Sequence, residues 1–423
     1  MNTTDDYAAF VALDWADKTH AFARHFAATN TTDNGTLAAT PEAVHAWLEE
    51  LHTKCGAGRV AVALEAGRKG LLHALVEHPW LDVFPVHPAA CHRFTSAFRP
   101  SGAKDDIPDA QTLLTMVMHH RAKLRQLRLD SAQTRELAAL VLARRQAVNR
   151  RTQLGSQLRT ALKGYFPQAL ELIGDNLECS AALDFLQRWP DLTSAQKARP
   201  ATLRGFYHQH AVRRPQVIEE RLALIAGVRP LTSDPAVIGP AVLQVTMFVE
   251  LLRVLQKHVE RFEARVAEIF AVHPAAAFFR QLPGAGPTLA PRLLVAFGDD
   301  LGRYQEASDL QMFSGVAPVQ QKSGTQLWVH WRWNASTFLR QTFVEWAGQT
   351  VLYSTWARAY YFRQKQHGKH RQSILRALAF KWIRILWRCW QDHAPYDEAR
   401  YLESLKRRRS PLAAEIERGL AAA

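Results

Sequence analysis

The amino-acid sequence predicts an α/β domain at the N-terminus, a long helical segment after it, and a mainly helical C-terminal domain. Over the first 120 residues, short apolar runs typical of buried strands alternate with segments of helical periodicity. Beyond residue 105 the pattern is helical almost throughout. Within that part, residues 131–165 and 245–269 repeat apolar side chains at the spacing of long, packed helices.

Length and composition limit the class of protein. The chain has 423 residues, 48% of them hydrophobic, which suffices for two to four units with cores and excludes a mainly disordered chain. No apolar run approaches the roughly 20 residues that cross a bilayer, so we expect no membrane-spanning segment. Four cysteines without CxxC spacing argue against zinc ribbons and disulfide frameworks and favour the cytoplasm: Cys55, Cys91, Cys179 and Cys389.

Charge is distributed unevenly along the chain. The overall net charge is +14, but residues 1–120 hold 9 basic and 14 acidic side chains, a net charge of −5. Residues 121–423 hold 44 basic and 25 acidic side chains, a net charge of +19. This division indicates metal chemistry in the first part and polyanion binding in the second. A basic protein with solvated Lys and Arg faces explains the composition equally well.

Elements of the N-terminal domain follow from apolar runs and turn residues. The pair Asn34-Gly35 is typical of a hairpin turn between strands. Asp14 and Glu65 each close an apolar run. We therefore expect strands at residues 10–14, 19–26, 59–64 and 81–86, and a helix at residues 70–78.

The second long helix carries the clearest repeat. Its apolar side chains recur every seven residues, with a second apolar set three places after the first, which predicts a coiled coil or a long helical hairpin. Residues 167–240, rich in proline, read as an inserted helical subdomain. The two apolar sets are Val245, Leu252, Val259 and Val266, and Phe248, Leu255, Phe262 and Ile269.

Four domains are expected along the chain. They are a metal-binding domain at residues 1–125, a helical and coiled-coil region at 126–275, a C-terminal domain at 276–400, and a basic tail at 401–423.

Four carboxylates in the first domain point to metal binding. Asp14 and Glu65 stand beside buried strand positions, where an ionised carboxylate is costly unless it is paired or binds a cation. Pro108 fits the first turn of a helix, which places Asp106 near its cap and Asp109 one turn later on the same face. Hard oxygen ligands of this kind suit Mg²⁺ or Mn²⁺. Helix caps and ordinary surface acids are the alternative.

Two motifs in the C-terminal domain contain glycine turns. Gly284 and Gly286 in LPGAGPTLAPRLLVAFGD (residues 282–299) lie between helix-compatible segments, as in a helix-hairpin-helix that holds a DNA phosphate with backbone N–H groups. A plain turn between helices with a glycine cap is the alternative. In FSGVAPVQQKSG (residues 313–324), Ser323 precedes a glycine in a polar loop. On these residues alone, a turn is favoured over a nucleophile.

Aromatic and basic residues are interleaved between residues 328 and 371, and eight of the twelve tryptophans lie between Trp328 and Trp390. Basic groups neutralise phosphates, and aromatic faces stack on unpaired bases. We expect Trp382, Trp387 and Trp390 to belong to a helix core instead. The candidate nucleic-acid contacts are Arg144, Arg145 and Arg151 in the first long helix, and Arg332, Arg363, Lys365, Lys369 and Arg371 in the aromatic segment.

Together these motifs resemble the DEDD-type transposases of insertion-sequence family one-ten, relatives of the Piv invertase now known as bridge-RNA-guided recombinases. VALDWADKTH, VALEAGRKG and KDDIPDAQTL are similar to the motifs of that family's RuvC-like domain, which has the RNase H fold. The two glycine motifs resemble those of its transposase domain. The resemblance covers residues 7–165 and 276–390. One departure is Asp105, where the family often has Thr or Asn.

The resemblance implies a mechanism and partners. Asp14, Glu65, Asp106 and Asp109 would bind magnesium, and Ser323 would attack the scissile phosphate to form a phosphoserine link to DNA. The implied partners are donor DNA, target DNA, a bridge RNA, and further copies of the chain, assembled through the coiled coil into a dimer and then a tetramer.

Two other functions remain open on the sequence. One is a RuvC-like nuclease that cuts DNA junctions with water, and the other is a non-catalytic nucleic-acid scaffold. A serine esterase is excluded, because the chain has no nucleophile elbow and no plausible triad spacing.

Overall fold

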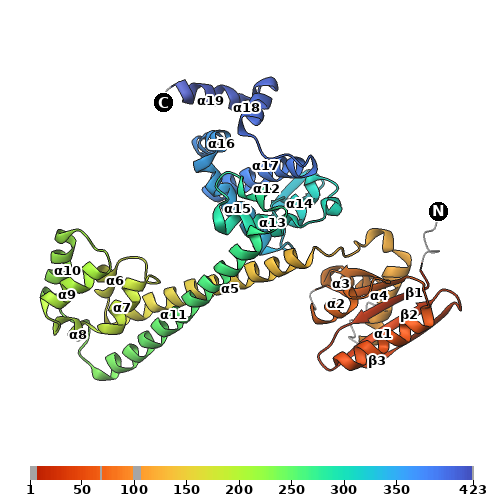
Figure 1. Ribbon diagram of the computed structural model, residues 1–423, viewed down its shortest axis with the longest axis horizontal. Coiled ribbons are helices and arrows are strands. Elements are labelled where there is room, and N and C mark those ends of the chain that lie inside the picture. The colour runs from red at the N-terminus through yellow and green to blue at the C-terminus, as the bar shows by residue number, and fades with distance from the viewer. Residues whose placement is uncertain (1–6, 67–68, 99–105, 422–423) are drawn as a thin grey trace. The chain divides into compact units, whose positions relative to one another are not determined.

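The computed structural model describes residues 7–66, 69–98 and 106–421 of the chain. Two compact units are present, Met1–Leu129 and Asp130–Ala423. The first is an α/β unit, and the second is helical apart from one β-hairpin within the described residues (Figure 1).

Unit 1 is built on a five-stranded mixed sheet with the order β3-β2-β1-β4-β5. β1 pairs antiparallel with β2 and parallel with β4, and all positions of β1 and β4 except the last are buried. A strand buried on both faces needs apolar side chains at successive positions, which is why the apolar runs do not alternate with polar residues. The strands are β1 (Ala9–Asp14), β2 (Thr19–Phe26), β3 (Thr31–Ala38), β4 (Val60–Glu65) and β5 (Leu81–Val86).

Helices cover both faces of this sheet. Val11 and Leu13 of β1 pack into one core with α1 and α2, whereas Phe10 and Ala12 pack into the other core with α4. The predicted strands and the predicted helix are confirmed to within two residues at their ends. The helices of unit 1 are α1 (Pro41–Cys55), α2 (Lys69–Val76), α3 (Pro88–Phe98) and α4 (Asp106–His119).

The predicted turn at Asn34-Gly35 is wrong. Both residues lie inside β3, and the chain reverses earlier, where Asn30 adopts a positive φ of 49°. Gly35 pairs across the sheet with Phe22, and a Cβ at Gly35 would lie 3.0 Å from that aromatic ring. The glycine is therefore needed for the close approach of a neighbouring ring, which the local sequence does not reveal.

Unit 2 begins with two long helices, α5 (Ala132–Tyr165) and α11 (Pro235–Ala271), which lie side by side and antiparallel (Figure 1). Val245, Leu252 and Val259 of the heptad repeat are buried. The repeat therefore forms a long hairpin within one chain. By length and composition alone, α11 is apolar enough to cross a membrane. One such helix is weak evidence of a span, because packing against α5 also requires an apolar face.

Five shorter helices fill residues 167–234 and pack against the far end of this hairpin (Figure 1). Pro200 and Pro215 occupy the first turns of two of them, where a missing N–H costs no helical hydrogen bond. The prolines that make this region look irregular therefore start helices. The helices are α6 (Ala169–Ile173), α7 (Ser180–Arg188), α8 (Leu192–Gln196), α9 (Pro200–Gln209) and α10 (Pro215–Gly227).

The C-terminal part of unit 2 packs around a core in which Trp346, Trp356 and Trp382 are fully buried. Trp387 and Trp390 are half-buried against the same core, so the expected core role of the late tryptophans is confirmed. The elements are α12 (Ala276–Arg280), α13 (Gly286–Phe297), α14 (Ala307–Phe313), β6 (Val319–Ser323), β7 (Gln326–His330), α15 (Thr337–Tyr353), α16 (Thr355–Gln366), α17 (Arg371–Gln391), α18 (Glu398–Arg407) and α19 (Pro411–Ala421).

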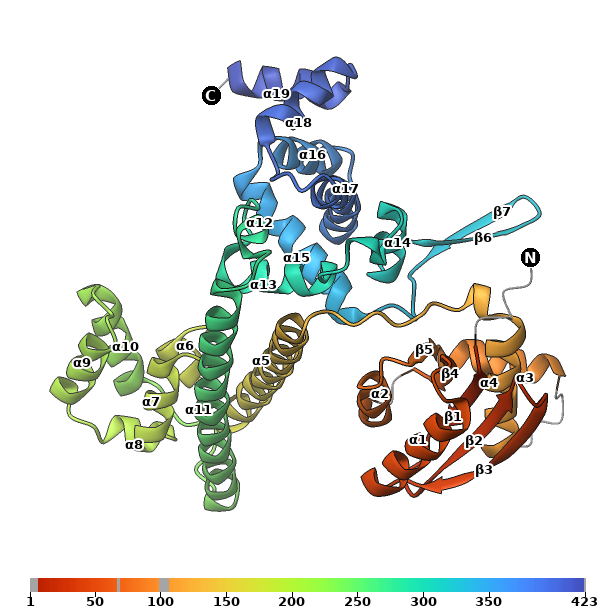
Figure 2. The same cartoon turned by 45° about the vertical axis from the view of Figure 1, so that its right-hand side comes forward.

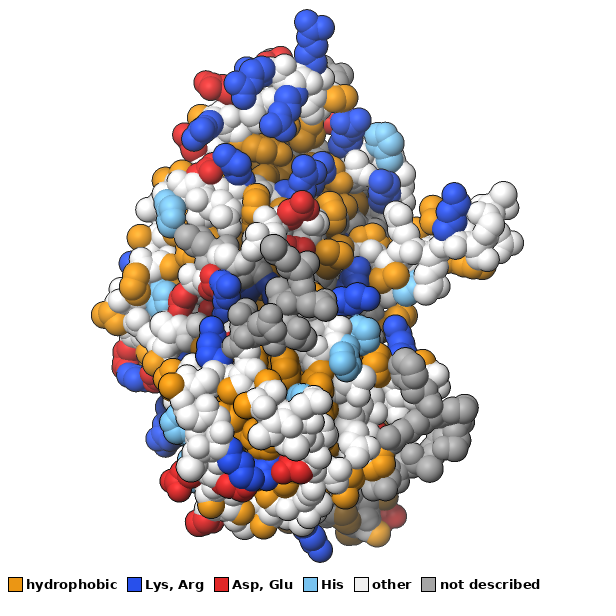
Figure 3. All heavy atoms as spheres, turned by 90° about the vertical axis from the view of Figure 1, so that its right-hand side faces the viewer, with side chains coloured by type: hydrophobic (Ala, Val, Ile, Leu, Met, Phe, Trp, Pro, Cys, Tyr) orange, Lys and Arg blue, Asp and Glu red, His pale blue; other side chains and the backbone are white. Residues whose placement is uncertain are grey.

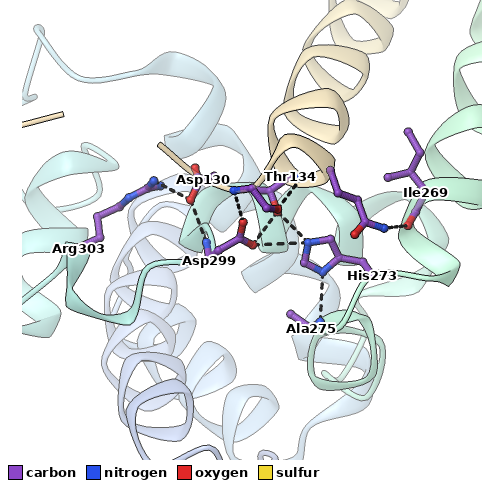
Figure 4. Close-up of polar contacts among 9 residues, drawn as sticks. Asp130, Thr134, Ile269, His273, Ala275, Asp299 and Arg303 are labelled. Carbon is purple, nitrogen blue, oxygen red and sulfur yellow. Dashed lines mark hydrogen bonds and ion pairs between the residues drawn. The ribbon is translucent and has the colours of Figure 1, made fainter. Parts of the chain in front are cut away.

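Asp299 ties the ends of the long helices to the C-terminal core (Figure 4). Its carboxylate accepts hydrogen bonds from the backbone N–H of Ser131 and the hydroxyl of Thr134, both at 2.6 Å, at the start of α5. The Nε2 atom of His273, just after α11, lies 2.7 Å from that same hydroxyl. Asp130 accepts from the backbone N–H of Asp299 and pairs with Arg303. Burial raises the pKa of the Asp299 carboxyl, but the hydrogen bonds from Ser131 and Thr134 outweigh it and the net direction is down.

Replacing Asp299 by Asn should lower the free energy of unfolding by about 2 kcal/mol near neutral pH, because charged hydrogen bonds are lost. The folded pKa of Asp299 lies below its unfolded value, so this stabilisation is present above about pH 4 and is lost as the pH falls through the folded value. Urea unfolding should therefore show the difference between the two proteins shrinking in acid. Asp392→Asn, which removes a surface pair with Arg388, is the matched control. A difference that did not depend on pH would contradict the role of the Asp299 charge.

Candidate active site

Two of the predicted metal ligands lie next to each other at one edge of the sheet in unit 1. β1 and β4 are parallel neighbours, with Leu13 opposite Leu64. Asp14 directly follows Leu13 and Glu65 directly follows Leu64, so both carboxylates lie at the carboxyl ends of adjacent strands. Both residues are half-buried, although the preceding positions of the two strands are fully buried. This is the juxtaposition expected from the two apolar runs.

The third carboxylate reaches the same region from a helix. Asp109 lies in the first turn of α4, which packs across β1 and β4. The pKa of the Cys91 thiol on α3 is affected by the charges of all three carboxylates. This pKa is raised to about 11, mainly by burial and then by the charges of Glu65, Asp109 and Asp14, in that order of size. The three negative charges are therefore close enough to act on one side chain.

The fourth predicted ligand is only partly described. Asp106 begins α4, but its side chain and all of Asp105 lie outside the described residues. Among the side chains that are described, no group of three His, Cys, Asp or Glu lies close enough to hold a metal ion. The chemistry of the donors nevertheless fits a hard cation. They are carboxylate oxygens, and the nearby thiol stays protonated and does not offer a soft sulfur ligand.

Ser323 lies at the tip of a β-hairpin in unit 2, where the sequence predicted a polar loop. β6 and β7 pair antiparallel with Ser323 opposite Gln326, so Gly324 and Thr325 form a two-residue turn. Gly324 has a φ of 58°, as the first central residue of a type II′ turn requires. The hairpin projects from the helical body, and Ser323 is exposed (Figure 2). The pair Gly324-Thr325 between two five-residue segments is the feature of the sequence that could have predicted this hairpin.

Strand alternation places Trp328 on the same face of this hairpin as Ser323. Trp328 pairs with Gln321, two residues before Ser323 on β6, whereas Leu327 and Val329 point to the opposite face. All three apolar side chains of β7 are exposed. The serine hydroxyl therefore shares its face with an accessible aromatic ring.

The glycine motif forms a tight turn between α12 and α13. Gly284 and Gly286 have φ values of 69° and 54°. A Cβ at Gly284 would come within 2.9 Å of both Gln349 and Tyr353 on α15, so the turn can pack there only without a side chain. Gly286 is exposed at the start of α13. The packing accounts for Gly284, whereas Gly286 has an exposed position and no such packing constraint.

Several predicted nucleic-acid contacts are paired with acids of the same chain. Arg144 pairs with Glu263 across the α5–α11 hairpin, and Arg145 approaches Glu345 at 3.5 Å. The predicted set divides accordingly. Arg151 pairs with Glu178 and Arg363 pairs with Glu415, so the paired members are Arg144, Arg145, Arg151 and Arg363. The other members form no ion pair with any residue that the structure describes; they are Arg332, Lys365, Lys369 and Arg371.

Two family models match the chain. One, described as a transposase and named for the DEDD enzymes of IS110 elements, matches residues 11–167. The other, described as the transposase IS116/IS110/IS902 family, matches residues 276–362. The chain belongs to the IS110 family of transposases. The first match includes the four predicted metal ligands, and the second includes the glycine turn and Ser323.

Relatives of this transposase extend over most of its length. A mini-circle protein of Streptomyces coelicolor, named as a transposase for IS117, is 28% identical over 94% of this chain and 97% of its own. The 42 kDa protein of insertion element IS900 from Mycobacterium paratuberculosis is 25% identical over 80% of this chain and 84% of its own. These matches confirm the predicted family, and membership of it implies cleavage and rejoining of DNA.

Neutralising any of the three described carboxylates should lower the pKa of Cys91. The effect should be largest for Glu65→Gln, because that charge acts most strongly on the thiol. A fall of about 0.5 raises the thiolate fraction about threefold at a pH below the pKa. The rate of alkylation of Cys91 in EDTA, with the other cysteines replaced by Ser, measures this. Exposed Glu77→Gln is the control, and equal rates in all variants would contradict convergence of the carboxylates.

Proposed function

We propose that this transposase cuts and rejoins DNA through a covalent phosphoserine intermediate at Ser323, with a divalent metal ion held by Asp14, Glu65, Asp106 and Asp109. The main support is that Asp14 and Glu65 end adjacent parallel strands, and that the charges of Asp14, Glu65 and Asp109 all act on the thiol of Cys91. A bound Mg²⁺ or Mn²⁺ would neutralise phosphate oxygens and lower the pKa of an attacking hydroxyl.

The serine step conserves the energy of the DNA backbone. The Oγ atom of Ser323 loses its proton and forms a bond to phosphorus, and the bond from phosphorus to one strand oxygen breaks, leaving a free hydroxyl. A hydroxyl of another strand then attacks the phosphoserine and restores the backbone. Exchange of strands in this way needs no nucleotide cofactor, in agreement with a sequence that contains no P-loop motif. An exposed hairpin tip gives a DNA strand access to the serine.

We also propose that donor and target sites are chosen by a bridge RNA, as in the guided recombinases that the motifs resemble. Base pairing would then supply sequence specificity, and the protein would contact backbone and shape. Lys and Arg side chains gather over the C-terminal helices, at the top of the face in Figure 3. The members of the predicted set that form no ion pair with a described residue, Arg332, Lys365, Lys369 and Arg371, are the preferred contacts, together with the backbone N–H of Gly286.

Assembly into a dimer and then a tetramer is proposed to use the helical hairpin. The face of α11 turned away from α5 exposes an apolar stripe at heptad-like spacing. Leu243 in this stripe is 73% exposed. A second copy would cover such a stripe, and the remaining members of the stripe are Met247, Leu251 and Val254.

Replacing Ser323 by Ala should abolish the covalent link to DNA. Incubation of the transposase with a nicked duplex from the end of its own insertion sequence, followed by denaturing electrophoresis, should reveal a slowly migrating adduct only when the hydroxyl is present. Thr325→Ala, which removes the neighbouring hydroxyl of the same turn, is the matched control and should form the adduct. Persistent cutting by Ser323→Ala without an adduct would favour the junction nuclease that uses water.

Removing a carboxylate should weaken metal binding independently of DNA. Asp14→Asn, Glu65→Gln and Asp109→Asn should each reduce Mn²⁺ affinity by at least the roughly 10–100-fold that loss of an outer-shell partner causes. Calorimetric titration of Mn²⁺ measures the affinity, and Mg²⁺-dependent strand cleavage should fall in parallel. Exposed Asp17→Asn, close to Asp14 in sequence, should leave both unchanged. Unchanged Mn²⁺ affinity in the three variants would exclude this metal site.

A further inference from the structure

Two arginines share one tryptophan ring at the base of the β6–β7 hairpin. Trp331 directly follows β7 and is 42% exposed. The guanidinium carbon of Arg376 on α17 lies 3.8 Å from the centroid of this ring, and that of Arg340 on α15 lies 5.2 Å from it. Helices and hairpin therefore bring two positive charges to the same aromatic side chain.

A third arginine joins this group. The Nη1 atom of Arg340 lies 3.5 Å from the carbonyl oxygen of Arg332. Arg376 donates from Nε to the carbonyl oxygen of Val316, at the entry to the hairpin, at 3.0 Å. We call Arg332, Arg340 and Arg376 with Trp331 the arginine cluster.

The charges of the arginine cluster are not compensated. Considering only described residues, none of its three arginines forms an ion pair with an acid. The Nε atom of Arg332 and the Nη2 atom of Arg376 are buried without a hydrogen-bond partner. Burial, and then the charge of Arg340, lower the pKa of Arg376. These arginines differ from those of the α5–α11 hairpin, where Arg144 and Arg265 pair with acids.

Such an arrangement is costly unless an anion binds. Like charges repel. Partly buried guanidinium N–H groups without acceptors have lost their hydrogen bonds to water and have gained none within the protein. The planar donors of arginine match the oxygens of a phosphate in pairs, which a carbonyl oxygen does not do. We propose that the arginine cluster is a binding site for a backbone phosphate of the DNA strand that Ser323 attacks.

The position of the cluster predicts which phosphate it holds. Val319 pairs with His330 at the base of the hairpin, and Ser323 lies four residues further along β6. At about 3.4 Å per residue, the serine is roughly 14 Å from the base, which equals about four base-pair steps measured along the axis of B-DNA. This assignment to DNA rests on the proposed function, because it takes Ser323 as the reacting group.

Salt dependence of DNA binding tests the site. Arg376→Gln and Arg340→Gln should each reduce the slope of log affinity against log salt by about 1, since each removes one phosphate contact. The probe is a 30-base-pair duplex from the end of the transposon. Arg388→Gln on the same helix is the control, because Arg388 is exposed and paired with Asp392. An unchanged slope in both cluster variants, with the fold intact, would overturn the proposal.

Two further measurements protect the test against misfolding. Thermal unfolding identifies any variant that loses its structure, and Arg376→Lys, which keeps the charge, should retain the slope while losing affinity.

A modified DNA tests which phosphate is bound. With the unmodified protein, a single neutral methylphosphonate about four steps from the cut should weaken binding, and binding by Arg340→Gln should not change with this modification. A uniform response at every position would overturn the assignment of one phosphate.

Other outcomes separate this proposal from the proposed function. Ser323→Ala should bind DNA with an unchanged salt slope. If no covalent adduct forms in any protein and the cluster variants still lose slope, the serine mechanism fails while the phosphate site stands. If the variants lose affinity only for single-stranded RNA of the same sequence, the site holds RNA, and the assignment to DNA is overturned.

Discussion

Like charges held close together are the constraint on which the interpretation of this fold depends. The charges of Asp14, Glu65 and Asp109 all act on one thiol in unit 1, and the guanidinium groups of Arg340 and Arg376 both lie over the ring of Trp331 in unit 2. Repulsion within each group opposes folding, so other contacts must offset it. In unit 1 the offset comes from strands buried on both faces, directly before the two strand-end carboxylates. A protein that maintains two such groups of opposite sign is suited to bind a cation and a phosphate.

The net positive charge of the second part of the sequence is not all available for binding a polyanion. The strongly basic second part includes many arginines that bind acids of the same chain, such as Arg144 with Glu263 and Arg204 with Glu219. Those pairs hold helices together and leave little charge for a polyanion. Within the part of the chain that the structure describes, the arginine cluster and Lys365, Lys369 and Arg371 form no ion pair with an acid. Net charge predicts a polyanion partner, but only side-chain pairing distinguishes structural arginines from available ones.

Local patterns predicted the elements well and the contacts between elements poorly. Asp14 and Glu65 could be found because each follows an apolar run, and parallel pairing then brings them together. Gly35 was misread because its cause is the ring of Phe22 on the neighbouring strand. The hairpin that carries Ser323 was missed, since its strands are exposed and lack the apolar alternation of a half-buried sheet. The arginine cluster depends on three elements meeting, which no local pattern indicates.

The hairpin also needs an anchor, and the arginine cluster supplies it. An isolated two-stranded hairpin is at best marginally stable in water, and this one buries almost none of its side chains. Arg376 fixes both of its ends, by the hydrogen bond to Val316 before β6 and by the contact with Trp331 after β7. A phosphate bound between the guanidinium groups would remove their repulsion and so strengthen the same contacts. Binding of DNA would therefore stiffen the hairpin that presents Ser323, which would couple capture of the strand to placement of the proposed nucleophile.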